Sequence, residues 1–302
     1  MDERFRGLGV AMVTPFRDPS TGSGGLIDYA GLERLIEHMI TGGVDYLVSM
    51  GTTGESVTLT KAEKHELLAQ TIGFVHNRVP IVLGVGGNNT AEVIETLNGF
   101  EMDGVDAILS VSPYYNKPTQ EGIYQHYKAI ARSSLRPIIL YNVPGRTGSN
   151  ITAETTVRLA RDFSNIIGIK EASANLDQMG SILKHKPADF MLISGDDALT
   201  LPIIAMGGVG VISVAGNALP QECSMLVDAA LKSDLTTARK EHLRLIEVIN
   251  LLFVEGNPGG IKEVLKVLGV CGDTMRLPLV NISEGTAKKL YHALADADVV
   301  RL

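Results

Sequence analysis

Cysteine is scarce in this sequence, which limits the compartments and chemistries that suit it. Cys223 and Cys271 are the two cysteines among 302 residues. They form no CxxC pair or Cys/His cluster and cannot build a disulfide framework. Such a composition is typical of a reducing compartment and predicts a cytoplasmic location. The N-terminus, MDERFRGLG, is charged and lacks the apolar stretch of a signal peptide.

The chain also lacks an excess of basic residues. It has 27 Lys and Arg against 34 Asp and Glu, which gives a formal net charge of −7. Without a basic block it is a poor candidate for binding nucleic acid or an anionic membrane, so we predict neither partner. HExxH, P-loop and His-rich motifs are missing as well, so the sequence predicts no metal or nucleotide cofactor.

One uncharged stretch, residues 198–219, is long enough to span a bilayer. It contains Pro202 and a glycine cluster at 207–210, and Pro220 follows it. These residues would break a single apolar helix. We therefore predict a helix end, a buried strand and a loop here instead of a membrane span.

Short apolar runs alternate with longer amphipathic stretches, and this alternation predicts a parallel sheet built from βαβ units. Eight repeats favour a closed (β/α)8 TIM barrel within the α/β class. An open doubly wound sheet is the alternative, but Thr14-Pro15-Phe16 stands where such a fold would carry a glycine-rich nucleotide loop. The predicted strands are residues 9–14, 46–50, 81–85, 107–111, 137–141, 166–170, 190–194 and 210–214.

Helix starts are indicated by Asp28, by a Thr60/Glu63 capping box, and by Thr90 and Thr152. We expect residues 1–231 to form the catalytic barrel and residues 232–302 to form a C-terminal helical extension packed on it. The barrel helices are predicted at residues 29–40, 62–75, 91–102, 121–133, 153–162, 176–184, 199–206 and 222–231. Those of the extension are predicted at 235–253, 260–268 and 285–294.

Polar and glycine-rich segments follow most of the predicted strands. In a (β/α)8 barrel the carboxyl ends of the strands share one rim, which is the catalytic face. We therefore expect these segments to converge there. They are GTTGES (51–56), GGNN (86–89), SPYYNKP (112–118), YNVPGRTG (141–148) and SGDD (194–197).

Lys170 ends a strand that is otherwise apolar, IIGIK. A strand-end lysine often reaches solvent with its amine. However, Lys170 shares a strand face with Gly168, whose small size would leave room for a long side chain inside the barrel. Desolvation there would lower the pKa of the amine and make it a nucleophile for carbonyl groups. We therefore predict a Schiff-base lysine.

The other candidate residues have both structural and functional interpretations. Tyr141 is either a rim aromatic or a proton relay beside the amine, and Thr52 and Thr53 either serve the turn or hold a substrate carboxylate. Arg146 is either a surface residue or a residue whose guanidinium binds a second carboxylate. Tyr114 and Tyr115 could pack a subunit interface. Asp196 and Asp197 could bind a metal, but a helix start is favoured. His65 and His126 are expected on helices, in contact with solvent.

Six motifs together resemble the dihydrodipicolinate synthase family, within the N-acetylneuraminate lyase superfamily of class I aldolases. The resemblance covers residues 7 to about 300, and it is specific only when the motifs are taken together. They are GTTGES (51–56), SPYYNKP (112–118), YNVPGRTG (141–148), IIGIKEA (166–172), SGDD (194–197) and LFVEGNP (252–258).

The resemblance implies a role for each matching residue. Lys170 would form a Schiff base with pyruvate, which then condenses with L-aspartate 4-semialdehyde in lysine and diaminopimelate biosynthesis. Thr52, Tyr141 and Tyr115 would relay protons, with Tyr115 reaching across from a neighbouring subunit of a homotetramer. The implied substrate-binding residues are Thr53 for the pyruvate carboxylate, Arg146 for the carboxylate of the semialdehyde, and Gly195, Asp196 and Ile212 for the pocket wall.

The resemblance also implies an effector site for L-lysine, which Ser56, Asn88, Glu92 and Tyr114 match. Val57, Lys61 and Lys64 stand where lysine-inhibited members commonly carry a small residue and two histidines. The positive charges of these two lysine side chains should weaken the binding of L-lysine, which is itself a cation. We therefore expect weak or absent feedback inhibition. Two alternatives remain: a sialic-acid or keto-sugar aldolase, which generally lacks the arginine matched by Arg146, and a non-catalytic barrel that senses a small acid.

Overall fold

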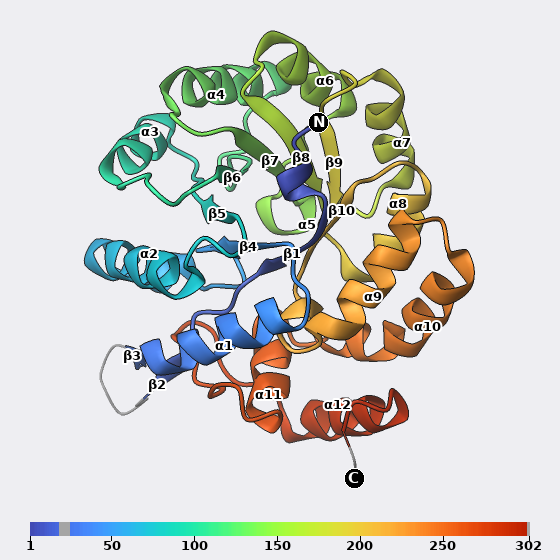
Figure 1. Cartoon of the computed structure of the whole chain (residues 1–302). Helices are drawn as coiled ribbons and strands as arrows, with labels where there is room; N and C mark the ends of the chain where they lie inside the picture. The colour runs from blue at the N-terminus through green and yellow to red at the C-terminus, as the bar shows by residue number, and fades with distance from the viewer. Residues whose placement is uncertain (18–24, 301–302) are drawn as a thin grey trace.

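The barrel predicted from the alternation of strands and helices is present in the structure, a computed structural model that describes residues 1–17 and 25–300. Eight parallel strands form a closed barrel in the order β1-β10-β9-β8-β7-β6-β5-β4 (Figure 1). Strand β1 closes it by pairing with both β4 and β10. The strands are β1 Gly7–Ala11, β4 Tyr46–Ser49, β5 Ile81–Gly84, β6 Ala107–Val111, β7 Ile138–Asn142, β8 Ile166–Glu171, β9 Met191–Ser194 and β10 Gly210–Ser213.

The barrel helices surround the strands as a ring (Figure 1). Each apolar strand is covered by side chains on both faces, which explains why the strands read as short continuous apolar runs. The helices are α1 Tyr29–Thr41, α2 Lys61–Val75, α3 Thr90–Gly99, α4 Gln120–Ser133, α6 Ala153–Asp162, α7 Leu176–His185, α8 Thr200–Ala205 and α9 Pro220–Leu231.

The helix-start predictions are confirmed in part. Thr60 and Glu63 form the capping box of α2, and the Thr152 hydroxyl accepts from the Thr155 backbone N–H at the start of α6. Asp28 precedes α1 but makes no side-chain capping bond. The prediction at Thr90 is wrong by one residue, because Asn89 caps α3 through the Ala91 N–H.

The structure also contains short strands and short helices that the sequence patterns did not predict. β2 (Phe16–Arg17) and β3 (Leu26–Ile27) form an antiparallel ribbon. Helix α5 (Pro144–Thr147) follows β7 directly. The 3-10 helices are η1 Glu3–Phe5, η2 Ser56–Thr58, η3 Asp197–Leu199 and η4 Ala215–Asn217. Each spans four residues or fewer, which is too short to produce a hydrophobic period.

The uncharged stretch at 198–219 folds as predicted, into the end of η3, α8, β10 and η4. Among the residues that the structure describes, no helix combines the length and the apolar character needed to cross a membrane.

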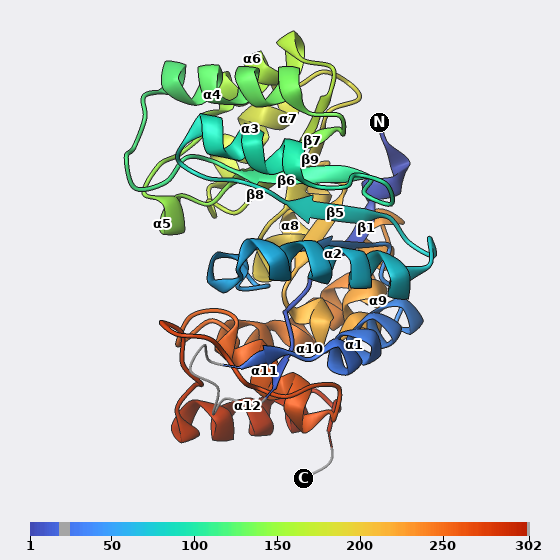
Figure 2. The ribbon, with the colours of Figure 1, turned by 90° about the vertical axis from the view of Figure 1, so that its left-hand side faces the viewer.

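The extension consists of α10 (Leu235–Leu251), α11 (Gly259–Val267) and α12 (Glu284–Asp296). Helix α10 packs on α9, α12 contacts both α10 and α11, and α11 contacts η4. Figures 1 and 2 both show α11 and α12 outside the ring of barrel helices. The predicted boundary after residue 231 falls between α9 and α10, and the division of the chain into a catalytic barrel and a helical extension stays a prediction.

The expectation that His126 contacts solvent is wrong. His126 is 5% exposed, and one of its ring nitrogens is 2.8 Å from the Thr90 hydroxyl at the start of α3. Burial lowers its pKa to about 4, because the charged imidazolium would lose its hydration. His65, in contrast, is partly exposed and packs against the Phe100 ring.

Candidate active site

The side chain of Lys170 lies inside the barrel. Lys170 pairs with Tyr141 of β7 and Ile193 of β9, and both partners belong to the apolar cluster inside the barrel. It is 5% exposed, and its Nζ lies 4.5 Å from the centre of the Tyr141 ring. Within the described part of the chain, its amine has no carboxylate partner. A buried amine in this position is available as a nucleophile.

The space for this lysine comes from a different glycine than the sequence suggested. Gly168 does share the inward face, but a Cβ there would lie 2.9 Å from the Met191 carbonyl oxygen, so its size serves the packing of β8 on β9. A Cβ on Gly195 would lie 2.7 Å from the Ala172 Cβ and 3.1 Å from Lys170 Cε, so a side chain there would press on both. Gly195, at the end of β9, therefore gives the lysine its room.

A cavity of about 330 Å³ opens above Lys170 at the carboxyl ends of the strands. Thr52 and Thr53 reach it from the loop after β4, and Arg146 reaches it from α5. The structure thus brings together seven residues predicted from the sequence. They are Thr52, Thr53, Tyr141, Arg146, Lys170, Gly195 and Asp196.

Asp196 has a second contact that explains its place in the sequence. Its carboxylate accepts a hydrogen bond from the Ala198 N–H at 2.9 Å and caps η3, as predicted. Asp197 is buried, and it accepts from the Ser213 hydroxyl and the Val214 N–H. Burial raises the pKa of Asp197. Across the described ranges, no group of three or more His, Cys, Asp or Glu residues could hold a metal ion.

A buried polar network, which the sequence did not indicate, holds the segment that carries Arg146. The Glu171 carboxylate accepts from Asn142 Nδ2 at 3.1 Å and from Gln178 Nε2 at 2.9 Å. Asn142 Oδ1 in turn accepts from the Ile151 N–H. Burial raises the pKa of Glu171. The network connects the end of β8, next to Lys170, with both ends of the loop between β7 and α6.

Two predicted residues lie apart from this cavity. Tyr115 is 88% exposed and has a positive φ of 71°, and its N–H bonds to the Thr147 carbonyl at 3.3 Å. Ile212 is buried in the apolar cluster inside the barrel and is not among the residues that line the cavity. Their roles stay predictions.

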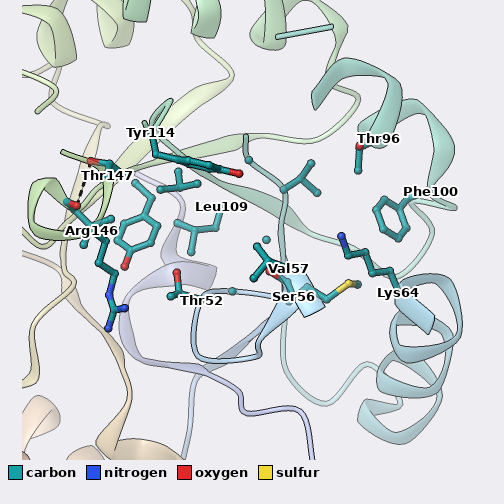
Figure 3. A pocket seen from close by; sticks show the side chains of 18 residues that line it. Thr52, Ser56, Val57, Lys64, Thr96, Phe100, Leu109, Tyr114, Arg146 and Thr147 are labelled. Carbon is teal, nitrogen blue, oxygen red and sulfur yellow. Dashed lines mark hydrogen bonds between the residues drawn. The ribbon is translucent and has the colours of Figure 1, made fainter. Parts of the chain in front are cut away.

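A second cavity of about 340 Å³ adjoins the first and shares Thr52, Tyr141 and Arg146 with it. Figure 3 shows Thr52 and Arg146 at one end, and Lys64, Thr96 and Phe100 at the other. Of the predicted effector residues, Ser56 and Tyr114 line this cavity, as do Val57 and Lys64. Asn88 donates to the Tyr114 carbonyl at 3.1 Å, and Glu92 is exposed on α3; neither lines the cavity.

Part of the first cavity is built by the extension, which sequence reasoning missed. Ile249, Asn250, Phe253 and Asn257 line it. Asn257 Nδ2 donates to the Thr53 hydroxyl oxygen at 3.0 Å. The motif LFVEGNP at 252–258 pointed to this segment without giving it a role.

The (β/α)8 fold and a buried lysine at the catalytic rim define an enzyme of the lyase class with the class I aldolase type of Schiff-base chemistry. The chain belongs to the dihydrodipicolinate synthetase family, whose model matches residues 4–297.

Individual relatives agree with this assignment. The chain is 52% identical over 296 residues to 4-hydroxy-tetrahydrodipicolinate synthase of Phocaeicola vulgatus, and 98% of each chain is covered. It is 50% identical over 298 residues to the synthase of Parabacteroides distasonis, with 99% of each covered. The crystal structure of dihydrodipicolinate synthase from Aquifex aeolicus is similar with a TM-score of 0.93 at 39% identity, covering 98% of this chain and 99% of that one.

Proposed function

We propose that Lys170 forms a Schiff base with pyruvate and that the resulting enamine attacks the aldehyde of L-aspartate 4-semialdehyde. The activity is 4-hydroxy-tetrahydrodipicolinate synthesis, which belongs to lysine and diaminopimelate biosynthesis. One observation carries the proposal: the Lys170 amine is buried at the cavity without a carboxylate partner, beside the Tyr141 ring.

The chemistry needs only the amine and a route for protons. The amine adds to the ketone carbon of pyruvate, and the carbinolamine loses water to give a protonated imine. This imine is an electron sink, so loss of a methyl proton yields an enamine. The enamine carbon bonds to the aldehyde carbon of the second substrate. The amine of that substrate then adds to the imine carbon, which closes the ring and frees Lys170.

Hydroxyl groups around the amine are suited to move these protons. Tyr141 and Thr52 line the same cavity as Lys170, and we assign them the proton relay together with Tyr115. We assign Tyr115 to the cavity of a neighbouring subunit, because it is 88% exposed and does not line the cavity of its own chain. That exposure supports our proposal of a homotetramer of tight dimers.

Thr53 and Arg146 are each assigned to bind one of the two substrate carboxylates. Thr53 is assigned to the carboxylate of pyruvate, close to Lys170. Arg146 is assigned to the carboxylate of the semialdehyde, since a guanidinium matches a carboxylate with two parallel hydrogen bonds. Gly195 and Asp196 line the cavity and are assigned to the wall of the pocket; the same assignment for Ile212 rests on the family resemblance alone, since Ile212 does not line the cavity. The presence of Arg146 at the cavity favours this acceptor over a sugar acid.

We propose a cytoplasmic location for the enzyme. Cys223 and Cys271 are both buried and free of disulfide bonds, which supports a reducing environment.

Borohydride trapping tests the proposal directly. The protein is treated with borohydride in the presence of pyruvate, and the adduct is mapped by peptide mass spectrometry. We expect the adduct on Lys170, its loss in Lys170→Met, and its retention in Lys184→Met, which changes an exposed lysine of α7. A folded protein without an adduct would remove the Schiff-base mechanism and leave a binding-only barrel.

A further inference from the structure

The loop between β4 and α2 contributes Thr52 and Thr53 to the cavity, and we name residues 51–60 the threonine loop. The loop begins with a turn, continues as η2 and ends at Thr60, which is the N-cap of α2. Side chains of the C-terminal extension contact this loop and the first turn of α2 at three places. These contacts join segments that lie more than 200 residues apart in the sequence.

The first contact is made by Asn257, which is 8% exposed and precedes α11. Its Nδ2 donates to Thr53 Oγ1, so a lone pair of the Thr53 oxygen is already occupied. A hydroxyl has a single proton to donate. With its oxygen accepting from Asn257, the Thr53 O–H is left to donate to an acceptor in the cavity, such as a carboxylate. Asn257 therefore sets the donor direction of Thr53.

The second contact is a buried ion pair. Glu55 has a left-handed backbone (φ 51°), and its carboxylate accepts from Lys262 Nζ of α11 at 2.5 Å and from the Arg276 N–H at 3.1 Å. Both side chains of the pair are fully buried. A buried ion pair is weak evidence for stability, because desolvation offsets most of the attraction. A role in fixing the loop accounts better for a charged pair at this position.

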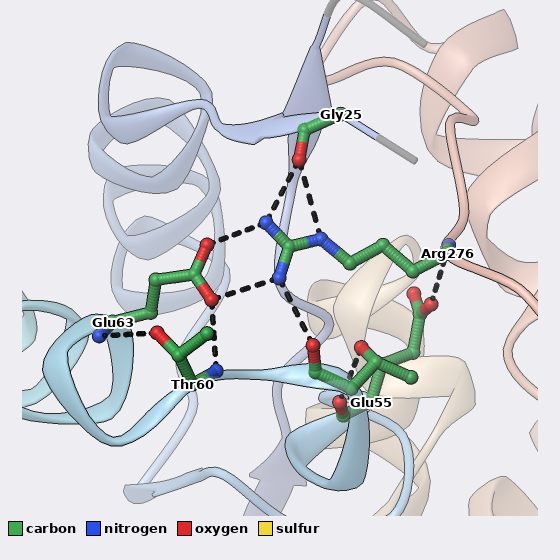
Figure 4. A network of polar contacts seen from close by, with 6 residues as sticks. Gly25, Glu55, Thr60, Glu63 and Arg276 are labelled. Carbon is green, nitrogen blue, oxygen red and sulfur yellow. Dashed lines mark hydrogen bonds and ion pairs between the residues drawn. The ribbon is translucent and has the colours of Figure 1, made fainter. Parts of the chain in front are cut away.

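The third contact lies at the far end of the loop (Figure 4). The Arg276 guanidinium donates to the Thr58 carbonyl at 3.1 Å and to both carboxylate oxygens of Glu63 at 2.9 and 2.6 Å. Glu63 also accepts from the Thr60 N–H in the capping box. The Arg276 guanidinium and Lys262 Nζ each lie 4.5 Å from the centre of the Phe16 ring. The extension thus holds the loop at Thr53 and at three points that follow it in the chain: Glu55, Thr58 and Glu63.

We propose that the C-terminal extension positions the threonine loop to bind pyruvate, with Asn257 orienting the Thr53 hydroxyl and the Glu55–Lys262 pair fixing the loop backbone. The inference rests on the proposed role of Thr53 at the pyruvate carboxylate. Asn257, Glu55 and Lys262 are positioning residues in this proposal. Their loss should weaken the use of pyruvate more than that of the second substrate.

A double-mutant cycle tests the action of Asn257 through Thr53. The first readout is the pyruvate concentration that gives half-maximal borohydride adduct on Lys170, which we call the pyruvate requirement. The second readout is KM for each substrate. We expect Asn257→Ala to raise the pyruvate requirement about tenfold, because the Thr53 hydroxyl would lose the orientation for its hydrogen bond to the charged carboxylate. In a Thr53→Val background the same change should have little further effect. Asn281→Ala, in an exposed part of the extension, is the matched control and should change neither value.

Two results would overturn the role of Asn257. The pyruvate requirement could be unchanged in Asn257→Ala, or it could rise by the same factor with and without the Thr53 hydroxyl. Wild-type protein is measured in parallel. An adduct on wild-type Lys170 together with either result rejects this inference alone. Absence of the wild-type adduct rejects the proposed function, and this inference with it.

The ion pair needs a variant that leaves no unpaired buried charge, since a single change at Glu55 or Lys262 can prevent folding. The double variant Glu55→Gln/Lys262→Met removes both charges and keeps similar side-chain volumes. We expect cooperative unfolding like that of the wild type, with a pyruvate requirement raised severalfold and a smaller change in KM for the second substrate. A folded double variant with the wild-type dependence on pyruvate would reject the ion pair as a positioning element.

Discussion

Arg146 is the residue on which the choice of the second substrate should depend. It lines the cavity above Lys170 and comes from α5, away from the lysine strand. We predict that Arg146→Ala retains the pyruvate adduct on Lys170 but raises KM for L-aspartate 4-semialdehyde about tenfold or more, because a paired guanidinium–carboxylate contact is lost. Steady-state kinetics at saturating pyruvate measure this. Arg158→Ala, on the exposed face of α6, is the control; equal KM values in all three proteins would contradict the assignment.

Glu63 should make the stability of the protein depend on pH in the acid range. Its hydrogen bonds from Arg276, with a smaller contribution from Thr60, lower its pKa from 4.5 to about 2. A carboxyl group whose pKa is lower in the folded state stabilises the fold above its unfolded pKa, and this stabilisation is lost as the pH falls through the folded pKa.

We therefore predict that Glu63→Gln lowers the free energy of unfolding by about 1 kcal/mol at pH 7. The difference from the wild type should shrink as the pH falls below about 4.5, because the wild-type carboxylate becomes protonated toward pH 2. Urea unfolding at pH 7, 5, 4 and 3 measures it. A difference that stays constant over this range would show that Glu63 stabilises the fold without its charge.

At the scale of elements, the barrel strands could be predicted because each is a short apolar run bounded by glycine or polar residues. The N-terminal end of β1 was missed by two residues, since Gly7 and Leu8 follow a charged segment. Helix α3 ends at Gly99, three residues before its predicted end, because the chain there leaves the helical conformation at Phe100. The side of a helix that faces a neighbour is set by packing, which is why the burial of His126 escaped prediction.

Closure of the barrel depends on glycine where β1 meets β10. Gly7 pairs with Gly210, which has a φ of 150°, and a Cβ on Gly210 would lie 2.0 Å from the Gly7 carbonyl oxygen. We predict that Gly210→Ala lowers the free energy of unfolding by at least about 2 kcal/mol, because the two strands have to move apart. Thermal unfolding measures this. Gly145→Ala, where a Cβ meets nothing within 4 Å, is the control; similar melting temperatures for the two variants would contradict the prediction.

The candidate site was predictable to the extent that its residues follow strands directly. Lys170 and Tyr141 lie within strands, and Thr52, Thr53 and Gly195 follow the ends of β4 and β9, so the topology of a parallel barrel brings them to one rim. The contribution of Asn257 could not be predicted in this way. It comes from an irregular segment between two helices, and no periodic pattern relates such a segment to a loop 204 residues earlier.

At the scale of the whole molecule, the assignment of Tyr115 to a neighbouring subunit can be tested by mixing two inactive variants. Lys170→Ala lacks the nucleophile, and Tyr115→Phe lacks the proposed relay hydroxyl. In a mixed dimer, one site has Lys170 from one subunit and Tyr115 from the other. Random reassembly should therefore restore about a quarter of the wild-type activity, as the two-fold symmetry of a dimer requires.

Mixing should be done after dissociation and reassembly, with each variant reassembled alone as the control. Activity no greater than the sum of the two variants would reject the crossing of Tyr115. Full activity in Tyr115→Phe itself would reject its relay role, and retention of the pyruvate adduct on Lys170 in that variant would separate relay from folding.

The second cavity suggests how the assembled enzyme should respond to L-lysine. Lys64 lines this cavity beside Ser56 and Tyr114, whereas Lys61 is exposed and does not line it. Because an ammonium in the cavity repels a cationic effector, we predict no strong inhibition by L-lysine below about 1 mM. Lys64→Ala should increase the sensitivity, and Lys61→Ala should change it less. Inhibition curves at fixed substrate measure this, and strong inhibition of the wild type would contradict it.

Because Arg276 contacts the threonine loop, a newly made chain can form these contacts only after Arg276 has been synthesised. A ribosome adds about 5 to 20 residues per second, so Arg276 is made roughly 10 to 40 seconds after Glu55. All the strands of the barrel, and Lys170 with them, are complete before the residues that hold Glu55 and Glu63 exist. In the arrangement we propose, a nascent chain therefore carries Lys170 well before its pyruvate site is assembled, and synthesis of α11 and of the segment up to Arg276 completes that site.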